Sequence, residues 1–273
     1  MDWEKIDDSI CCLIEDIRRE SIIKNEVIRD DIFDILESRS TVIYYPLDGE
    51  KNRGFHVKRI VKEELRDFVY INTAIPLAEQ VFTAAHELGH ICNVADNVWK
   101  SVAGNAPMTL KQEEDITDRF AADLLMPQDC FSRLFETHMK DMGITGNTIS
   151  LEQLARLMAF QMNDFLCPYE AVRRRLLELE IISDKIGDIL KDQENIQTLV
   201  NIFTMDQNTY LGEGTRIKTI PGLRSCIENA KQKQVDAYLI KRLETVFELK
   251  NIEITKTQIE LRNVGGEKVD NDK

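Results

Sequence analysis

The feature that most constrains the fold of this chain is a pair of histidines four residues apart, in the segment VFTAAHELGHIC at residues 81–92. Positions i and i+4 share one face of an α-helix, so His86 and His90 can present two imidazoles to the same metal ion. Glu87 follows His86 directly, where a carboxylate can take a proton from a metal-bound water without ligating the metal itself. The segment therefore predicts a helix that carries a catalytic metal site.

The opposite face of this predicted helix is apolar, since Val81, Ala85, Leu88 and Cys92 recur at helical spacing. A buried face would hold the two histidines rigidly, as a metal site requires. Gly89 costs a helix interior about 1 kcal/mol relative to alanine, so we expect another part of the chain to approach the backbone closely there. Two histidines on a helix face can also be ordinary surface residues. The motif, however, uses two of only four histidines in the chain.

A catalytic zinc needs three protein ligands and an open position for water, so a third ligand must come from elsewhere. The segment KQEEDITDRF at residues 111–120 predicts a helix on which Glu114 and Asp118 share a face, one turn apart. Glu114 can then bind the ion, and Asp118 can accept a hydrogen bond from the free nitrogen of a ligating histidine. A solvated acidic turn at a helix N-terminus is the alternative, and it fits Glu113 and Asp115 well.

Together these segments resemble a known family. TAAHELGH at residues 83–90, followed by EDITDRFAADLLMP at residues 114–127, is similar to the ImmA/IrrE-type metallopeptidases. The resemblance is clear over residues 68–127 and fainter over the preceding strands and the segment that ends near residue 182. Family members usually have a second acidic position after the glutamate ligand, where this chain has Ile116. That difference leaves Glu113 as an alternative third ligand. Glu114 is favoured because it lies on the same helix face as Asp118, four residues away.

The resemblance implies that His86, His90 and Glu114 bind Zn²⁺ and that Glu87 is the general base. It also implies a zincin-like fold and limited proteolysis of a regulatory protein, typically a helix-turn-helix repressor encoded nearby. We therefore expect a zinc-dependent endopeptidase. A protein that keeps zinc but acts only by binding a repressor, or that binds DNA, is the alternative. No residue is assigned to stabilising an oxyanion, although His56 and His138 are candidates in principle.

The pattern of the whole chain predicts an α+β fold: a zincin-like catalytic domain with a small sheet and the HExxH helix, followed by a mainly helical C-terminal lobe. Helices are expected near residues 4–20, 22–38, 72–92 and 109–125, and strands at 41–45, 55–60 and 68–71. A polar loop is expected between residues 93 and 108, and Ser150 with Gln153 predicts a capping box that begins a further helix.

Two domains are expected from this pattern. The catalytic domain spans residues 1–182 and includes a segment at 150–182 that resembles a helix-turn-helix unit. The region 183–273 has no motif, and its role is unassigned. Within it we expect a helical piece, a turn-rich stretch and an amphipathic helix near 223–249, with a frayed polar tail at 263–273.

The composition of the chain restricts the classes of partner that we expect the protein to bind. The formal net charge of −13 argues against nucleic acid as a partner for the average surface. The run Arg173–Arg175 is the strongest local basic candidate, but its alternation with glutamates favours a solvated helix face over DNA contact. No apolar run approaches the roughly 20 residues of a membrane helix, and the start is acidic, so we expect a cytoplasmic protein without membrane contact. The six cysteines form no CxxC pair and are expected to be thiols.

Overall fold

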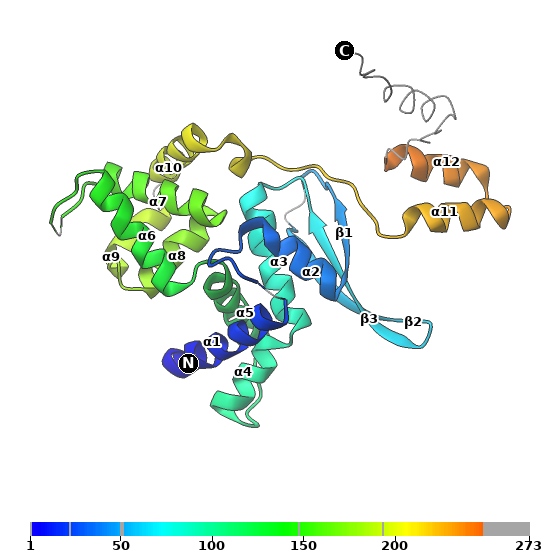
Figure 1. The fold of residues 1–273 in the computed structure, drawn as a ribbon, viewed down its shortest axis with the longest axis horizontal. Helices are drawn as coiled ribbons and strands as arrows, with labels where there is room; N and C mark the ends of the chain where they lie inside the picture. Colours follow the sequence, from blue (N-terminus) through cyan, green and yellow to red (C-terminus); the bar gives the residue numbers. More distant parts are fainter. Residues whose placement is uncertain (1, 22, 50–51, 147, 193, 248–273) are drawn as a thin grey trace, which may run out of the picture. The chain divides into compact units, whose positions relative to one another are not determined.

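A three-stranded sheet forms where the β-rich segments between residues 41 and 72 predict it. The computed structural model describes residues 2–21, 23–49, 52–146, 148–192 and 194–247. Its strands are β1 (Thr41–Tyr45), β2 (Gly54–Val61) and β3 (Glu64–Asn72). The order is β1-β3-β2, with β1 parallel and β2 antiparallel to the central β3 (Figure 1). Lys62 and Glu63 form the hairpin turn with positive φ at both positions, a backbone that matches the twist of the flanking strands.

One helix, α3, connects this sheet to the surrounding helices. The helices of this half are α1 (Trp3–Glu20), α2 (Ile32–Arg39), α3 (Leu77–Ile91), α4 (Val94–Ala103) and α5 (Leu110–Leu125). α3 packs on β2, β3, α2 and α5, and α5 in turn packs on α1 and α4. The face of α3 that carries Val81, Ala85 and Leu88 is fully buried, as the sequence pattern predicts. The motif helix is therefore anchored on several sides.

Local sequence signals determine where α3 and α5, the helices that carry the predicted metal ligands, begin and end. α3 begins directly after Pro76, whose fixed φ suits a helix start. α5 begins with a capping box, in which the Thr109 side chain accepts from the backbone N–H of Gln112 and the Gln112 side chain accepts in return. It ends before Met126 and Pro127, because the residue before a proline disfavours the helical conformation.

Two expectations in this half are wrong. The helix expected at 22–38 forms only from a short 3₁₀ turn at Arg29–Asp31 onward, before α2. Arg18 donates to the backbone carbonyls of Asn25 and Glu26, which are thereby bonded outside any helix. The loop expected between residues 93 and 108 contains α4 instead, because its apolar side chains pack into the core with α1 and α5. This apolar stripe outweighs the polar appearance of the segment.

Helices build the second half of the same compact unit. They are α6 (Gln128–Asp141), α7 (Leu151–Phe165), α8 (Tyr169–Glu178), α9 (Asp184–Asp192) and α10 (Glu194–Gln207), followed by the 3₁₀ turn η2 (Thr209–Gly212). The capping box predicted at Ser150 and Gln153 is confirmed at the start of α7. α7 packs on α6, α8 and α10, so the helix-turn-helix-like segment is covered by its neighbours (Figure 1).

The segment after η2 returns to the sheet. Tyr44 on β1 and Thr219 exchange backbone hydrogen bonds of 3.0 and 2.9 Å, and Arg216 donates its backbone N–H to Thr73. One compact unit therefore extends to Pro221 and contains residues 183–221, which the sequence analysis assigned to the C-terminal region. Whether residues 1–182 fold without them stays a prediction.

The second unit begins at Gly222. Within its described residues lie two short helices, α11 (Leu223–Gln232) and α12 (Ala237–Val246), rather than the single helix expected near 223–249. Gln234 has a φ of 54°, a left-handed conformation that a continuous helix does not admit. The tail expected to fray, residues 263–273, lies outside the described residues.

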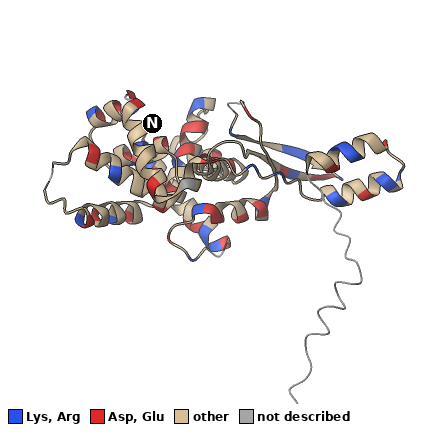
Figure 2. Cartoon of the chain, turned by 90° about the horizontal axis from the view of Figure 1, so that it is seen from above, with Lys and Arg blue, Asp and Glu red and all other residues tan. Residues whose placement is uncertain are grey.

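Charges are distributed along the helices. Figure 2 shows Lys and Arg interspersed with Asp and Glu rather than gathered on one element. The α+β fold class is confirmed. Among the helices that the structure describes, none combines the length and the apolar character of a membrane span.

Candidate metal centre

Two helices that lie side by side bring the predicted ligands together. α3 supplies His86 and His90, and α5 supplies Glu114. The Nε2 atoms of the two histidines are 3.1 Å apart, and Glu114 Oε2 lies 3.2 Å from His86 Nε2. Glu114 Oε1 lies 3.7 Å from His90 Nε2. These three residues are the group whose ligand atoms all lie within 4.8 Å of one another.

This donor set fits a zinc ion. Ligand atoms around a tetrahedral zinc lie about 3.3 Å apart when each bond is about 2.0 Å long. The separations of 3.1 Å between the two Nε2 atoms and 3.2 Å between His86 Nε2 and Glu114 Oε2 are close to that value, and the other carboxylate oxygen, Oε1, lies 3.7 Å from His90 Nε2. Two neutral imidazoles and one carboxylate are also the ligand types of known catalytic zinc sites, which leave one position for water. The side chain of Glu114 is 56% exposed, so solvent reaches the group.

Asp118 orients one of the two imidazoles. Its Oδ1 lies 2.9 Å from His86 Nδ1. An ionised carboxylate can only accept, so His86 donates from Nδ1 and its Nε2 lone pair faces His90 and Glu114. Arg174 on α8 approaches the other oxygen of Asp118 at 3.4 Å. Glu114 and Asp118 therefore lie one turn apart on the face of α5 that is directed toward α3, as their spacing in the sequence predicts.

Glu113, the competing candidate, lies elsewhere. Its Oε1 is 3.7 Å from His90 Nδ1, the nitrogen that faces away from His86 and Glu114. This distance exceeds that of a hydrogen bond, and the residue is not part of the group whose ligand atoms converge. From sequence, Glu113 was either part of a solvated turn or an alternative third ligand, and the structure places its carboxylate near the outer nitrogen of His90.

Glu87 is buried beside the ligands. The residue is 4% exposed, and its Oε2 has no hydrogen-bond partner among the described residues. Burial raises the pKa of Glu87 to about 7, against the opposing effect of His86. An unpartnered buried carboxylate oxygen is costly unless a ligand or water satisfies it, so we expect this atom to gain a partner when water or substrate enters the site.

The start of β2 lies close to Glu87. A Cβ on Gly54 would lie 2.6 Å from Thr83 Cγ2, 2.7 Å from the Tyr70 carbonyl oxygen and 3.6 Å from Glu87 Oε1. Only glycine therefore permits the strand to pass this close to α3. Sequence spacing alone did not connect Gly54 with Glu87. A glycine next to a strand is a signal for close backbone approach.

The two imidazoles differ electrostatically. Burial lowers the pKa of His86, but the hydrogen bond and charge of Asp118, with smaller effects from Glu87 and Glu114, raise it above the usual value overall. Burial and the charge of His86 lower the pKa of His90. Of the two imidazoles, His86 is therefore the more basic.

The close approach expected at Gly89 is confirmed. A Cβ there would lie 2.8 Å from Thr117 Cγ2 and 3.0 Å from Phe120 Cδ1, both on α5. Gly89 thus sets how closely α3 and α5 can pack, and hence the distance between the histidines and Glu114.

The remaining histidines are engaged in pairs of their own. His56 on β2 lies 2.6 Å from Asp67 on β3, and it is near enough to His90 that its charge contributes to the lowered pKa of His90. His138 on α6 lies 2.7 Å from Asp164 and stacks on Phe160. Neither is part of the group that could hold a metal.

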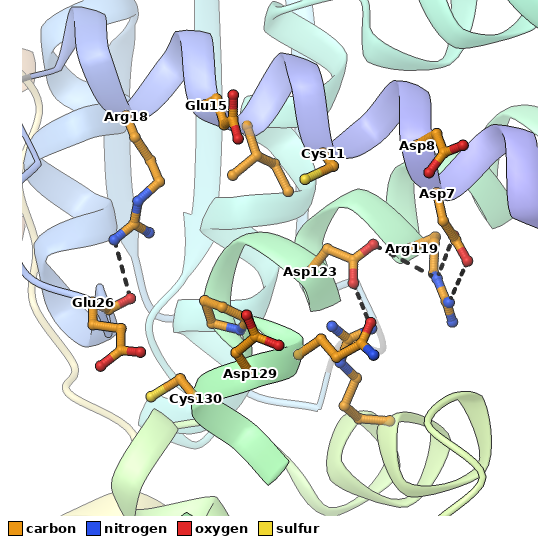
Figure 3. A pocket seen from close by; sticks show the side chains of 14 residues that line it. Asp7, Asp8, Cys11, Glu15, Arg18, Glu26, Arg119, Asp123, Asp129 and Cys130 are labelled. Carbon is orange, nitrogen blue, oxygen red and sulfur yellow. Dashed lines mark hydrogen bonds and ion pairs between the residues drawn. The ribbon is translucent and has the colours of Figure 1, made fainter. Parts of the chain in front are cut away.

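A network of ion pairs connects α1, α5 and α8 (Figure 3). Arg119 donates to both carboxylate oxygens of Asp7 at 2.9 and 2.8 Å, and it also pairs with Glu178. Arg175 pairs with Asp123 and donates to the Met126 carbonyl at 3.0 Å. These pairs link the helix that carries Glu114 to its supports.

The arginine run is therefore no solvated basic face, and that expectation is wrong. Arg173 and Arg175 are buried, and Arg173 is held by Glu170 and the Gly187 carbonyl. Arg174 alone is exposed, and it contacts Glu170 and Asp118. The tertiary packing of α8 between α5, α7 and α9 turns two of the three guanidinium groups inward.

Comparison with protein families gives one match. The family model described as Peptidase_M78, IrrE N-terminal-like domain, matches residues 38–177, which include both helices of the metal centre. No curated protein and no solved structure matches the chain.

Proposed function

Since the chain belongs to the Peptidase_M78 family of IrrE N-terminal-like domains, we propose that it is a zinc-dependent endopeptidase. Its substrate is a regulatory protein, in our proposal a helix-turn-helix repressor, which it cleaves at limited positions. The observation that carries the proposal is the convergence of His86, His90 and Glu114, with ligand atoms within 4.8 Å, beside a buried and unpartnered Glu87.

His86, His90 and Glu114 would hold the ion, and Asp118 would keep His86 Nε2 directed at it. Zinc, when bound, supplies Lewis acidity for the scissile carbonyl and lowers the pKa of a coordinated water toward about 7. Glu87 takes the proton of the attacking water on its unpartnered Oε2 and passes it to the leaving amine. The burial of Glu87, which is 4% exposed, limits bulk water around its carboxylate.

Incubation with candidate repressors tests this proposal. The purified protein, supplied with zinc, is mixed with helix-turn-helix proteins encoded beside it, and the fragments are sequenced. We expect one or few cleavage sites, no cleavage by Glu87→Gln and none after chelation of the metal.

A zinc-binding regulator without hydrolytic activity is the rival. It would bind a repressor with zinc present and leave the repressor intact. Detection of a stable complex without fragments would therefore replace the proposed function by this alternative.

A further inference from the structure

A cavity lies one helical turn from the metal centre. Its volume is about 500 Å³, and its walls come from α1, α3, α5 and α8. Asp118, which bonds His86, lines the cavity, as does Phe82, which precedes His86 by one turn on the same face of α3. A peptide held at the metal centre can therefore place one of its side chains in this cavity.

The electrostatic character of the cavity is acidic. Its lining includes four carboxylates, from Asp7, Asp115, Asp118 and Glu178, and two guanidinium groups, from Arg119 and Arg174. Both guanidinium groups are engaged, since Arg119 pairs with Asp7 and Glu178, and Arg174 pairs with Asp118 and Glu170. The arginines of the wall are thus neutralised, and an excess of negative charge remains.

Asp115 contributes one unpaired charge to this excess. It is half-buried on α5, and within the described ranges no hydrogen bond or ion pair reaches its carboxylate. The sequence analysis assigned Asp115 to a solvated acidic turn, yet the structure places it on the wall of a cavity. A partly desolvated, unpaired carboxylate favours a cationic partner.

The rest of the wall suits a long aliphatic stem. Trp3 and Phe82 contribute aromatic side chains, and Ala122 and Ala171 contribute small apolar ones. Aromatic rings attract a guanidinium or ammonium group and pack against its methylene chain. The cavity therefore combines the two features that recognise a basic side chain.

We propose that this cavity binds an arginine or lysine side chain of the peptide substrate and that Asp115 sets this specificity. The proposal rests on the proposed peptidase function, because it places a substrate segment at the metal centre. It concerns recognition alone, so binding can test it without turnover.

The test uses short, terminally blocked, fluorescent peptides that are identical except for one residue, arginine or norleucine. Norleucine keeps the aliphatic stem and lacks the charge. Binding is measured by anisotropy to the zinc-supplied Glu87→Gln protein, which retains the cavity. We expect about tenfold tighter binding of the arginine peptide, the effect of one hydrogen bond to a charged group. The preference should vanish in Glu87→Gln/Asp115→Asn and persist in Glu87→Gln/Asp141→Asn, a matched change at an exposed aspartate on α6.

Equal affinity for the two peptides, or no measurable affinity for either, overturns the proposal. So does a preference that survives Asp115→Asn. Hydrolysis of the same peptides by the unmodified protein is a separate readout. If the arginine peptide binds with the expected preference and remains uncut, the proposed function fails and the recognition site stands.

Discussion

At the residue scale, Glu87 and Glu114 are both carboxylates beside the histidine pair, yet their surroundings differ. Glu87 is buried with an unpartnered oxygen, whereas the Glu114 side chain is largely exposed and both of its oxygens face the imidazole nitrogens. Glu114, whose oxygens face the Nε2 atoms of the histidines, is placed to ligate a metal ion. Glu87, which is buried beside the histidines, is placed to transfer a proton.

We predict that Glu87→Gln retains zinc and loses hydrolysis by a factor of at least about 10². The amide keeps the size of the side chain and removes its basicity, while the three ligands stay unchanged. Zinc content by atomic absorption and cleavage rate are measured on the same preparation. Full activity would disprove the general-base assignment, and loss of zinc would move Glu87 into the ligand set.

The three acidic residues of α5 should differ in their effect on zinc affinity. Glu114→Ala removes one of the three proposed ligands and should weaken binding most. Asp118→Ala should cost about 10 to 100-fold because Asp118 only orients His86. Glu113→Ala should cost less than about tenfold, since Glu113 lies 3.7 Å from the outer nitrogen of His90. Competition with a chelator gives the three dissociation constants. If Glu113→Ala proves the most damaging, the helical register is wrong by one residue.

At the element scale, the contact between α3 and α5 determines the geometry of the centre, and Gly89 is its closest point. We predict that Gly89→Ala destabilises the protein by about 1–3 kcal/mol despite the higher helix propensity of alanine, because its Cβ would overpack against Thr117 and Phe120. Zinc affinity should fall as well, since the two helices must separate.

Thr117→Ser provides the matched test of this cause, because it deletes the methyl group nearest to the new Cβ. Combined with Gly89→Ala it should restore part of the stability and of the zinc affinity. Chemical denaturation measures the first and chelator competition the second. Strict additivity of the two changes would show that the contact does not limit the packing.

α8 offers a second test through two adjacent arginines. Arg175 is buried and pairs with Asp123, whereas Arg174 is exposed. Arg175→Met should lower the free energy of unfolding by about 1.5–3 kcal/mol, because it removes one of the two guanidinium partners of the half-buried Asp123 and the donor to the Met126 carbonyl. Arg174→Met should cost less than about 1 kcal/mol. Urea unfolding of both variants measures the difference, and equal costs would contradict the buried arrangement.

At the scale of the whole molecule, the compact unit with the metal centre extends to Pro221. α10 covers α7 with the buried side chains of Ile196 and Val200, and the chain near Thr219 pairs with β1. We predict that a chain ending at residue 221 unfolds cooperatively and binds zinc as the whole protein does. A chain ending at residue 182 leaves the α7 surface and the β1 edge uncovered and should aggregate or lose zinc affinity.

Differential scanning calorimetry and zinc titration of both chains decide between the two boundaries. A stable, zinc-binding chain of residues 1–182 would support the boundary expected from sequence and would make α9 and α10 an appendage. Failure of the chain ending at residue 221 would assign a stabilising role to residues 222–273.

The sequence alone sufficed for features that depend on local spacing. His86, Glu87 and His90 are placed by the periodicity of one helix, Glu114 and Asp118 by that of another, and the capping box of Ser150 by a contact three residues along. Hydrogen bonds between residues close in the chain set these relations, so they hold wherever the helix lies.

Only the tertiary structure decided which turn of α5 faces which turn of α3. It placed Glu113 near His90, Gly54 near Glu87 and Asp115 on a cavity wall, and it buried Arg175, which sequence reasoning expected in solvent. These outcomes depend on how segments far apart in the chain pack, and many packings share the same local periodicity. The energy of burying one particular set of side chains together selects among them.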